Sequence, residues 1–252
     1  MADAPHPATL ETERLSRSFG GLQAVRNVSI RVARGALHAV IGPNGAGKST
    51  LVNLLAGEIA PTSGRIKLDG ADVTGQPVWR MAHRGVGRSF QRTNIFPALS
   101  VLENVRLAAQ AVDRTQPNPL ASAAAPAIIE RAHAALARVG LDERTTRAAG
   151  TLSHGEQRQL EIAMALAGAP RVLLLDEPLA GMGPEESERM THLLKGLARD
   201  HAILLVEHDM DFVFQVADWM TVMTEGAVLA EGLPADIRAS KAVQDAYLGE
   251  HA

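Results

Sequence analysis

The stretch GPNGAGKS, Gly42 to Ser49, constrains what this chain can fold into more than any other feature. It matches the spacing G-x-x-x-x-G-K-[ST], in which the glycines let consecutive backbone N–H groups turn inward around a phosphate. The apolar run ALHAVIG ahead of it predicts a buried strand, and a helix is predicted from about Lys48 to Glu58. Because a strand, a glycine-rich loop and a helix follow one another, we expect an α/β fold that binds the phosphates of a nucleotide.

The side chains at the end of this loop have chemistry that fits a nucleotide. The ammonium group of Lys48 can reach the β- and γ-phosphates, and the hydroxyl of Ser49 can ligate Mg²⁺. An accidental glycine-rich turn is the alternative, but it would not explain the flanking strand and helix. We therefore expect ATP and Mg²⁺ as cofactors. The candidate ATP-binding residues are Gly42, Pro43, Asn44, Gly45, Ala46, Gly47, Lys48, Ser49 and Thr50.

Two adjacent carboxylates end a second apolar run, VLLLDEP. Asp176, at the end of the predicted strand, can hold the coordination shell of Mg²⁺. In an extended chain Glu177 points to the opposite side, where it can face the γ-phosphate and polarise a water molecule. Two acids at a strand exit are also common on any protein surface, but after a phosphate loop the catalytic interpretation is favoured.

A third motif is TLSHGEQ, Thr151 to Gln157. Ser153 and Glu156 have the spacing of a capping box, which predicts the start of a helix. Gly155 leaves the backbone bare beside the cap, and a bare helix start is positively polarised and attracts anions. The chain thus holds a second candidate phosphate site, far along the sequence from the first.

The remaining sequence predicts a mostly parallel sheet, because strand and helix patterns alternate. Two stretches, GRIKLDGADV and TVMTEGAVLAEG, predict hairpins, the first around Asp69-Gly70. Residues 93–150 are rich in alanine and helical in period. We therefore expect a loose N-terminal tail (1–9), an α/β core (10–92 and 151–252) and a helical insertion (93–150), with a further helix from about residue 152.

Composition and charge exclude several classes of protein. The net charge of −3 argues against a protein that neutralises the phosphates of nucleic acid, so no nucleic-acid partner is expected. There are no cysteines, which excludes disulfides and thiolate chemistry. No apolar run reaches the ~18 residues needed to cross a bilayer, and the start MADAPHPATL lacks the features of a secretion signal. We expect a cytoplasmic protein that reaches a membrane only through a partner.

From about Leu10 to Gly249 these motifs resemble, in order and spacing, those of the ATP-binding cassette (ABC) ATPases. The resemblance implies a P-loop NTPase fold, with a mostly parallel sheet core, an antiparallel β subdomain and a helical insertion subdomain. It also implies ATP hydrolysis coupled to transport.

The same resemblance implies roles for three further residues. Phe19 corresponds to the aromatic residue that stacks on adenine, although a place in the core stays an alternative for one phenylalanine. Gln91 in RSFQ corresponds to the glutamine that contacts Mg²⁺ or the attacking water, and His208 in LLVEHDM to the histidine that contacts the γ-phosphate. The implied catalytic residues are Glu177, His208 and Gln91, and the implied Mg²⁺ ligands are Ser49, Gln91 and Asp176.

The stretch LSHGEQ is similar to the family's signature sequence, LSGGQ. It keeps Ser153 and Gly155 and carries His154 and Glu156 in place of a glycine and the glutamine. In the family two cassettes face each other head to tail, and the signature of one meets the ATP of the other. The resemblance therefore implies that Ser153, Gly155 and Glu156 bind ATP in trans, with His154 facing away from the nucleotide. Gly183 stands where the family often has an aspartate that helps the two sites communicate.

Four short stretches point, less specifically than the main motifs, to one subgroup of the family. FGGLQAV, GVGRSFQ, VEHDM and the terminal AYLGE resemble the LivG-type ATPase subunits of branched-chain amino-acid importers. Importers of urea and short amides, and the ATPase of lipopolysaccharide export, are similar too and stay alternatives. The resemblance implies transmembrane permease partners, a second ATPase subunit that is the same or a related chain, and indirectly a periplasmic solute-binding protein. It places the chain at the cytoplasmic face of the inner membrane.

Two rival functions use the same phosphate loop. A soluble ABC protein outside transport typically carries two cassettes or a long coiled coil, and this chain shows one cassette with a short insertion. A small-molecule kinase would explain GPNGAGKS, but not LSHGEQ, Gln91 and His208 together.

Overall fold

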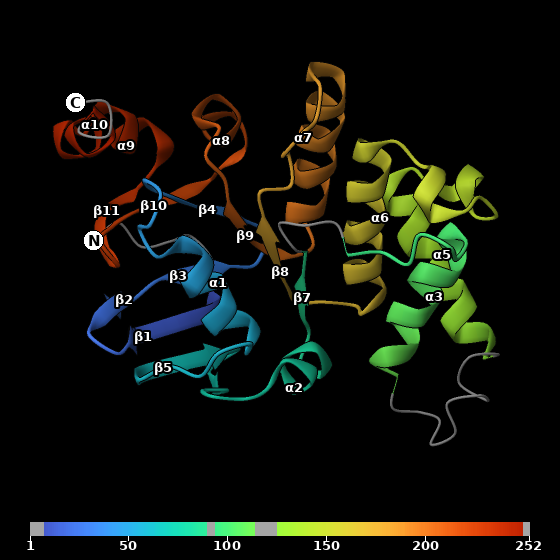
Figure 1. Cartoon of the computed structure of the whole chain (residues 1–252), viewed down its shortest axis with the longest axis horizontal. Helices are drawn as coiled ribbons and strands as arrows, with labels where there is room; N and C mark the ends of the chain where they lie inside the picture. The colour runs from blue at the N-terminus through green and yellow to red at the C-terminus, as the bar shows by residue number, and fades with distance from the viewer. Residues whose placement is uncertain (1–7, 90–93, 114–124, 249–252) are drawn as a thin grey trace.

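The computed structural model describes residues 8–89, 94–113 and 125–248. It contains two sheets, and a group of helices that includes α3, α5 and α6 forms one end of the molecule (Figure 1). This arrangement confirms the predicted α/β fold with an antiparallel part and a helical part.

Six strands form the larger sheet, in the order β11-β10-β4-β9-β8-β7. The five strands from β10 to β7 are parallel to their neighbours, and β11 alone pairs antiparallel, with β10. Every residue of β4, β8 and β9 is buried, because both faces of the sheet are covered. The three strands are accordingly apolar, except for His38 in β4 and Asp176 at the end of β8. The bounds are β4 (Leu37–Ile41), β7 (Val86–Arg88), β8 (Val172–Asp176), β9 (Ala202–Val206), β10 (Trp219–Thr224) and β11 (Ala227–Gly232).

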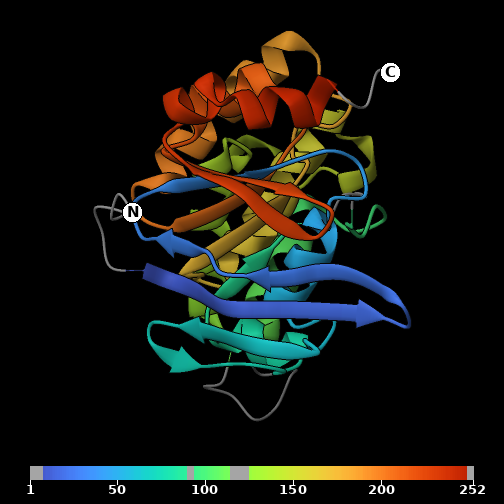
Figure 2. The ribbon, with the colours of Figure 1, turned by 90° about the vertical axis from the view of Figure 1, so that its left-hand side faces the viewer.

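The second sheet is antiparallel and is built on one long strand, β1. Strands β2, β3 and β5 pair with β1, and β6 pairs with β5. Figure 2 shows β1 crossing the molecule below the red β10–β11 hairpin. The bounds are β1 (Ala8–Phe19), β2 (Leu22–Val28), β3 (Arg31–Ala33), β5 (Ser63–Leu68) and β6 (Ala71–Asp72).

Two details of this sheet bear on the sequence predictions. The hairpin predicted around Asp69-Gly70 is the turn between β5 and β6, where both residues have the positive φ (47° and 77°) that a two-residue hairpin turn needs. The predicted tail of residues 1–9 is too long at its end, because β1 begins at Ala8, which pairs with Ala33 of β3.

The helices begin and end at recognisable sequence signals. Gly57 and Gly140, both with positive φ (78° and 75°), follow the last residues of α1 and α5, and Pro184 opens α7 as predicted. The bounds are α1 (Lys48–Ala56), α2 (Val78–His83), α3 (Val101–Ala111), α5 (Pro126–Val139), α6 (His154–Ala167), α7 (Pro184–Ala198), α8 (Met210–Val216), α9 (Pro234–Ala239) and α10 (Lys241–Leu248), with short 3-10 helices η1 (Asp142–Arg144) and η2 (Ala149–Thr151).

The larger sheet separates two hydrophobic cores. Leu173 and Leu175 of β8 belong to the core shared with α3, α5, α6 and α7, whereas Val172 and Leu174 belong to the core shared with α1 and the antiparallel sheet. Each fully buried aliphatic side chain contributes about 1.5–3 kcal/mol. Since α6 packs with α3 and α5, the division expected at residue 150 separates helices that share one core.

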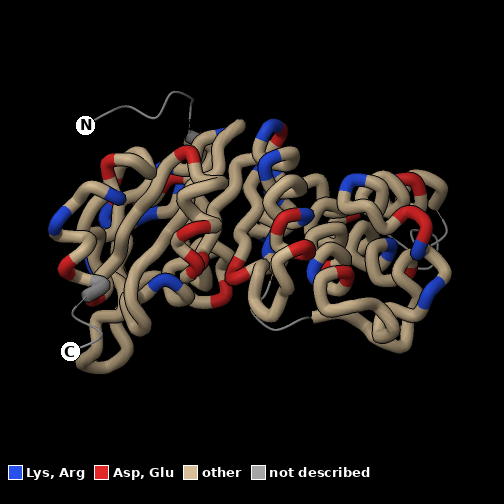
Figure 3. Tube along the Cα trace, turned by 90° about the horizontal axis from the view of Figure 1, so that it is seen from above, with Lys and Arg blue, Asp and Glu red and all other residues tan. Residues whose placement is uncertain are grey.

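Basic and acidic residues are mixed over the length of the molecule (Figure 3). Among the described residues, no helix is both long and apolar enough to cross a bilayer.

Candidate nucleotide-binding site

The phosphate loop joins the carboxyl end of β4 to the amino end of α1. Gly42 has a φ of 148° and Gly47 a φ of 98°, a conformation that favours glycine. A Cβ atom on Gly42 would overlap the carbonyl oxygen of Met223, and one on Gly47 the carbonyl oxygen of Ala24. Because Gly47 is the N-cap of α1 and has no side chain, the first N–H groups of the helix are left for an anion.

A cavity of about 820 Å³ adjoins this loop. It is lined by Asn44 to Thr50, by Gly21 and the first half of β2, by Glu177 and by the turn between β10 and β11. Its volume lies within the ~300–1,000 Å³ usual for small-molecule sites. The ammonium group of Lys48 donates hydrogen bonds to the carbonyl oxygens of Gly42 (2.5 Å) and Pro43 (2.9 Å), which holds its charge against the loop.

Asp176 is the last residue of β8 and is 4% exposed. Burial raises the pKa of this carboxyl group, and the positive charges of Arg88 and Lys48 oppose the rise. The nearest Arg88 nitrogen lies 4.0 Å from Asp176 Oδ2. A buried carboxylate within reach of the phosphate-loop lysine suits a divalent cation, whose charge would compensate the desolvation.

Glu177 lines the cavity, but not for the reason that the sequence suggested. The prediction assumed an extended chain, whereas Glu177 has a φ of 48° and its N–H donates to the carbonyl oxygen of Val206 (2.9 Å). A left-handed backbone at a non-glycine residue costs roughly 1 kcal/mol or more and is common at functional sites. The turn away from β8, rather than strand alternation, directs this carboxylate to the phosphate loop.

His208 follows β9 and lies beside Glu177. Its Nδ1 is 3.7 Å from Glu177 Oε1, and its side chain is 68% exposed. The structure therefore brings these two predicted catalytic residues together, with Glu177 lining the phosphate-loop cavity and the imidazole of His208 accessible to a ligand.

Glu207 is a neighbour of this pair that the sequence reasoning missed. It is 1% exposed, and its carboxylate accepts hydrogen bonds from the backbone N–H groups of Leu179 (2.9 Å) and His208 (3.2 Å). Burial raises its pKa, and these two N–H groups oppose the rise. The carboxylate ties the chain after Glu177 to the end of β9. An acid at the end of the apolar run AILLV was the available signal.

Phe19 ends β1 and is 45% exposed, which rules out the alternative place in the core. The guanidinium carbon of Arg17 lies 4.6 Å from the centre of its ring, and Arg17 also donates to the carbonyl oxygen of Ala60 (2.9 Å). The turn that follows Phe19 lines the phosphate-loop cavity. An exposed aromatic ring at this place suits stacking with a planar base.

The predicted capping box at the start of α6 is present. Ser153 Oγ accepts from the N–H of Glu156 (3.2 Å), and Glu156 Oε2 accepts from the N–H of Ser153 (2.9 Å). That N–H and the nearby Arg144 hold the pKa of Glu156 below its usual value. His154 lies over Gly181, where a Cβ would be 3.2 Å from its imidazole.

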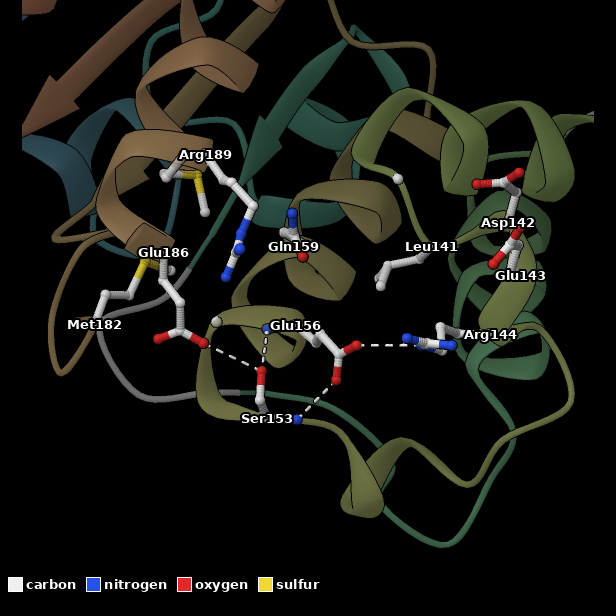
Figure 4. Close-up of a pocket in the computed structure, with 13 residues that line it drawn as sticks. Leu141, Asp142, Glu143, Arg144, Ser153, Glu156, Gln159, Met182, Glu186 and Arg189 are labelled. Atoms are coloured by element: carbon white, nitrogen blue, oxygen red, sulfur yellow. Dashed lines mark hydrogen bonds and ion pairs between the residues drawn. The ribbon is translucent and has the colours of Figure 1, made fainter. Parts of the chain in front are cut away.

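The signature residues line a different cavity from the phosphate loop. This second cavity, of about 480 Å³, lies between the end of α5, η1, α6 and α7 (Figure 4). Ser153, Gly155 and Glu156 line it, and no phosphate-loop residue does. Within one chain the two candidate phosphate sites are thus not brought together.

Gln91 lies outside the described residues. The described chain resumes at Asn94, whose N–H donates to Glu161 of α6 (2.6 Å). Glu161 in turn pairs with Arg158 (2.9 Å), and both side chains are buried.

A phosphate loop and a carboxylate-ended strand on one α/β sheet define a P-loop nucleotide-binding protein. The chain belongs to the ABC transporter family, whose sequence profile matches residues 25–180. A profile described as branched-chain amino acid ATP-binding cassette transporter matches residues 227–252. Membership of this family confirms the predicted ATP hydrolysis coupled to transport.

Relatives match nearly the whole chain. The high-affinity branched-chain amino acid transport ATP-binding protein BraF of Pseudomonas aeruginosa is 40% identical over 249 residues, which cover 96% of this chain and 98% of that protein. The corresponding LivG protein of Escherichia coli K12 is 39% identical with the same coverage.

Solved structures agree with the fold. A nucleotide-free ATP-binding cassette from an ABC transporter superposes with a TM-score of 0.85 at 29% identity, and the match covers 96% of this chain and 99% of that one. A dimeric bacterial ABC transporter cassette superposes with a TM-score of 0.75 at 25% identity and covers 89% and 98%.

Proposed function

We propose that this chain is the ATP-hydrolysing subunit of an importer of branched-chain amino acids. The observation that carries the proposal is similarity along nearly the full length to ATPases named for that transport, together with the family match at residues 227–252. That match covers β11, α9 and α10, which contain none of the motifs predicted to bind ATP.

In this proposal ATP occupies the 820 Å³ cavity. Its phosphates lie on the backbone N–H groups of the phosphate loop after Pro43, which has none, and beside Lys48, and its adenine stacks on Phe19. Mg²⁺ would be held by Ser49, Asp176 and Gln91. Among the described residues, no group of three or more His, Cys, Asp or Glu side chains is arranged to hold a metal ion by itself. Bound Mg²⁺ would therefore also be held by phosphate oxygens and water. When bound, it would neutralise phosphate charge.

Glu177 is the proposed general base. Its carboxylate accepts a proton from the water that attacks the γ-phosphate, and His208, 3.7 Å away, contacts that phosphate. Glu207 keeps the two side chains in this relation, because its carboxylate accepts from the N–H of Leu179, two residues after Glu177, and from the N–H of His208. The product of this step is ADP and phosphate.

The site of one chain is completed by a second ATPase subunit, the same or a related chain, in a head-to-tail dimer. The separation of the signature from the phosphate loop within one chain, and the dimeric cassette among the similar structures, support this. Transmembrane permease subunits would hold the pair at the cytoplasmic face of the inner membrane and receive solute from a periplasmic binding protein. Acidic and basic residues are mixed along the chain (Figure 3) and the net charge is −3, which supports a function without a nucleic-acid partner.

Uptake in the organism that carries this chain tests the proposal. We expect Lys48→Ala, made in the chromosomal gene, to abolish uptake of labelled leucine, isoleucine and valine and to leave urea uptake unchanged. Loss of urea uptake with normal leucine uptake would assign the chain to an amide importer. Normal uptake of both, in cells shown to contain the variant, would contradict the proposal.

A further inference from the structure

A carboxylate of the same chain occupies the start of the signature helix. Glu186, in the first turn of α7, accepts a hydrogen bond from the hydroxyl of Ser153, with 3.2 Å between Oε1 and Oγ (Figure 4). The same oxygen lies against the backbone of Gly155, where a Cβ atom would be only 2.5 Å away. Glu186 is thus packed on the two signature residues expected to meet the γ-phosphate of a partner's ATP.

Glu186 is also joined to its own helix. Its other oxygen, Oε2, lies 3.4 Å from the N–H of Gly183, the N-cap residue of α7. The carboxylate therefore bridges the starts of two helices, and both starts favour negative charge. Release from Ser153 would leave the contact with Gly183 available, so α7 need not unfold when the bridge opens.

A phosphate oxygen and a carboxylate oxygen compete for the same donors here. Both accept from a hydroxyl and from the N–H groups of a helix start, and both are anionic. The hydroxyl of Ser153 has one proton to donate. A γ-phosphate that takes this donor must displace Glu186, and like charges oppose any shared occupancy.

We propose that Glu186 is an internal competitor for the signature site: it fills the place of the γ-phosphate in the separated cassette and moves aside when an ATP-bearing partner closes. This inference rests on the proposed function. Glu186 then weakens dimer formation, because part of the favourable free energy of γ-phosphate binding is spent on displacing the carboxylate. After phosphate leaves, the returning carboxylate favours the open state.

The chain offers a matched pair of variants for the test. Glu186→Gln removes the competing charge and keeps the size of the side chain. Glu185→Gln makes the same change of charge one residue earlier in the same helical turn, at an exposed position. Both are made in a Glu177→Gln background, where bound ATP persists, and the dimer dissociation constant is measured by sedimentation in saturating Mg²⁺-ATP and in Mg²⁺-ADP.

With ATP, we expect Glu186→Gln to tighten the dimer about tenfold, the scale of one hydrogen bond to a charged group, and Glu185→Gln to leave it unchanged. With ADP, neither variant should dimerise more tightly than the parent, because ADP lacks the γ-phosphate that competes with Glu186. Glu186→Ala, which also removes the acceptor oxygens, should tighten the ATP dimer at least as much, and thermal melting verifies that it folds.

Two results would overturn the inference. The first is an unchanged or weaker ATP dimer in both Glu186 variants. The second is an equal tightening of the dimer in Glu185→Gln, or in Glu186→Gln with ADP. Either would mean that the dimer tightens because a negative charge is removed, and not because Glu186 leaves the signature site. If the Glu177→Gln parent shows no dimer with ATP at any protein concentration, the proposed head-to-tail dimer fails instead, so the two failures are distinguishable.

Discussion

At the scale of single residues, the proposed chemistry depends on the turn that follows β8. Glu177 reaches the cavity because its backbone adopts a left-handed conformation (φ 48°) directly after the buried Asp176. The two carboxylates are adjacent in sequence yet have different surroundings. Burial raises the pKa of Asp176, whereas Glu177 faces the cavity beside His208. This difference suits one carboxylate to a cation and the other to a proton transfer.

Glu177→Gln should keep ATP binding and slow hydrolysis by ~10² or more, the range of a lost general base. Phosphate release under saturating ATP measures the rate. Glu225→Gln is a suitable control, because Glu225 lines the same cavity from the β10–β11 turn and is paired with Arg26 (3.6 Å). Near-normal turnover in Glu177→Gln would remove Glu177 from this role.

Phe19→Ala should weaken ATP binding by ~1–3 kcal/mol, the scale of one base stacked on one aromatic side chain. Phe19→Tyr keeps the ring and should bind like the parent. Calorimetric titration with ATP in the Glu177→Gln background compares the three. Equal dissociation constants for alanine and phenylalanine would mean that the exposed ring does not contact adenine.

Some residues of the site could be predicted from the sequence and others could not, and the difference has a physical cause. The phosphate loop was predictable because its glycines are required by tight packing, at Gly42 against Met223 for example. The direction of Glu177 was not, since a single left-handed residue leaves no periodic signal. Glu207 was missed because its partners are backbone N–H groups brought close only by the fold.

At the scale of elements, the fully buried strands and the capped helix α6 were predictable, whereas the long strand β1 and the shortest elements were not. The buried strands β4, β8 and β9 are mostly apolar, and the capping box of α6 has a two-residue signature, Ser153 and Glu156. Elements as short as β7, with three residues, and α2, with six, are too brief for a periodic pattern and form through contacts with the rest of the fold.

The central strand β4 also carries a buried histidine with a consequence for stability. His38 is 1% exposed, and its nitrogens lie 3.0 Å from the carbonyl oxygen of Arg31 and 2.8 Å from the hydroxyl of Thr221. Burial lowers the pKa of His38 to about 4, against 6.5 without the fold. Between these two pKa values His38 is protonated in the unfolded chain and neutral in the folded chain. The free energy of unfolding therefore falls as the pH drops.

His38→Gln should remove the part of this pH dependence that belongs to His38. Between pH 6.5 and 4, the free energy of unfolding should fall about 3 kcal/mol less in the variant than in the parent. Urea unfolding at stepped pH, followed by circular dichroism, measures the difference. His201, whose pKa burial also lowers, keeps its share in both proteins. Parallel curves for the two proteins would contradict the assignment.

At the scale of the whole molecule, the fold keeps two groups of residues apart that must both contact ATP. The phosphate loop and the signature helix line separate cavities of about 820 and 480 Å³, and Glu186 closes over the signature from its own chain. Neither cavity alone holds all the residues expected to meet ATP. A complete ATP site therefore requires a second cassette, and bound ATP should join the two chains.

Light scattering tests this requirement most directly. The Glu177→Gln protein, whose chain mass is 26.7 kDa, is measured over a range of concentrations with Mg²⁺-ATP, with Mg²⁺-ADP and without nucleotide. We predict a dimer of twice that mass with ATP and a monomer in the other two conditions. A monomer with ATP at every concentration would contradict the central claim that two cassettes share each ATP site.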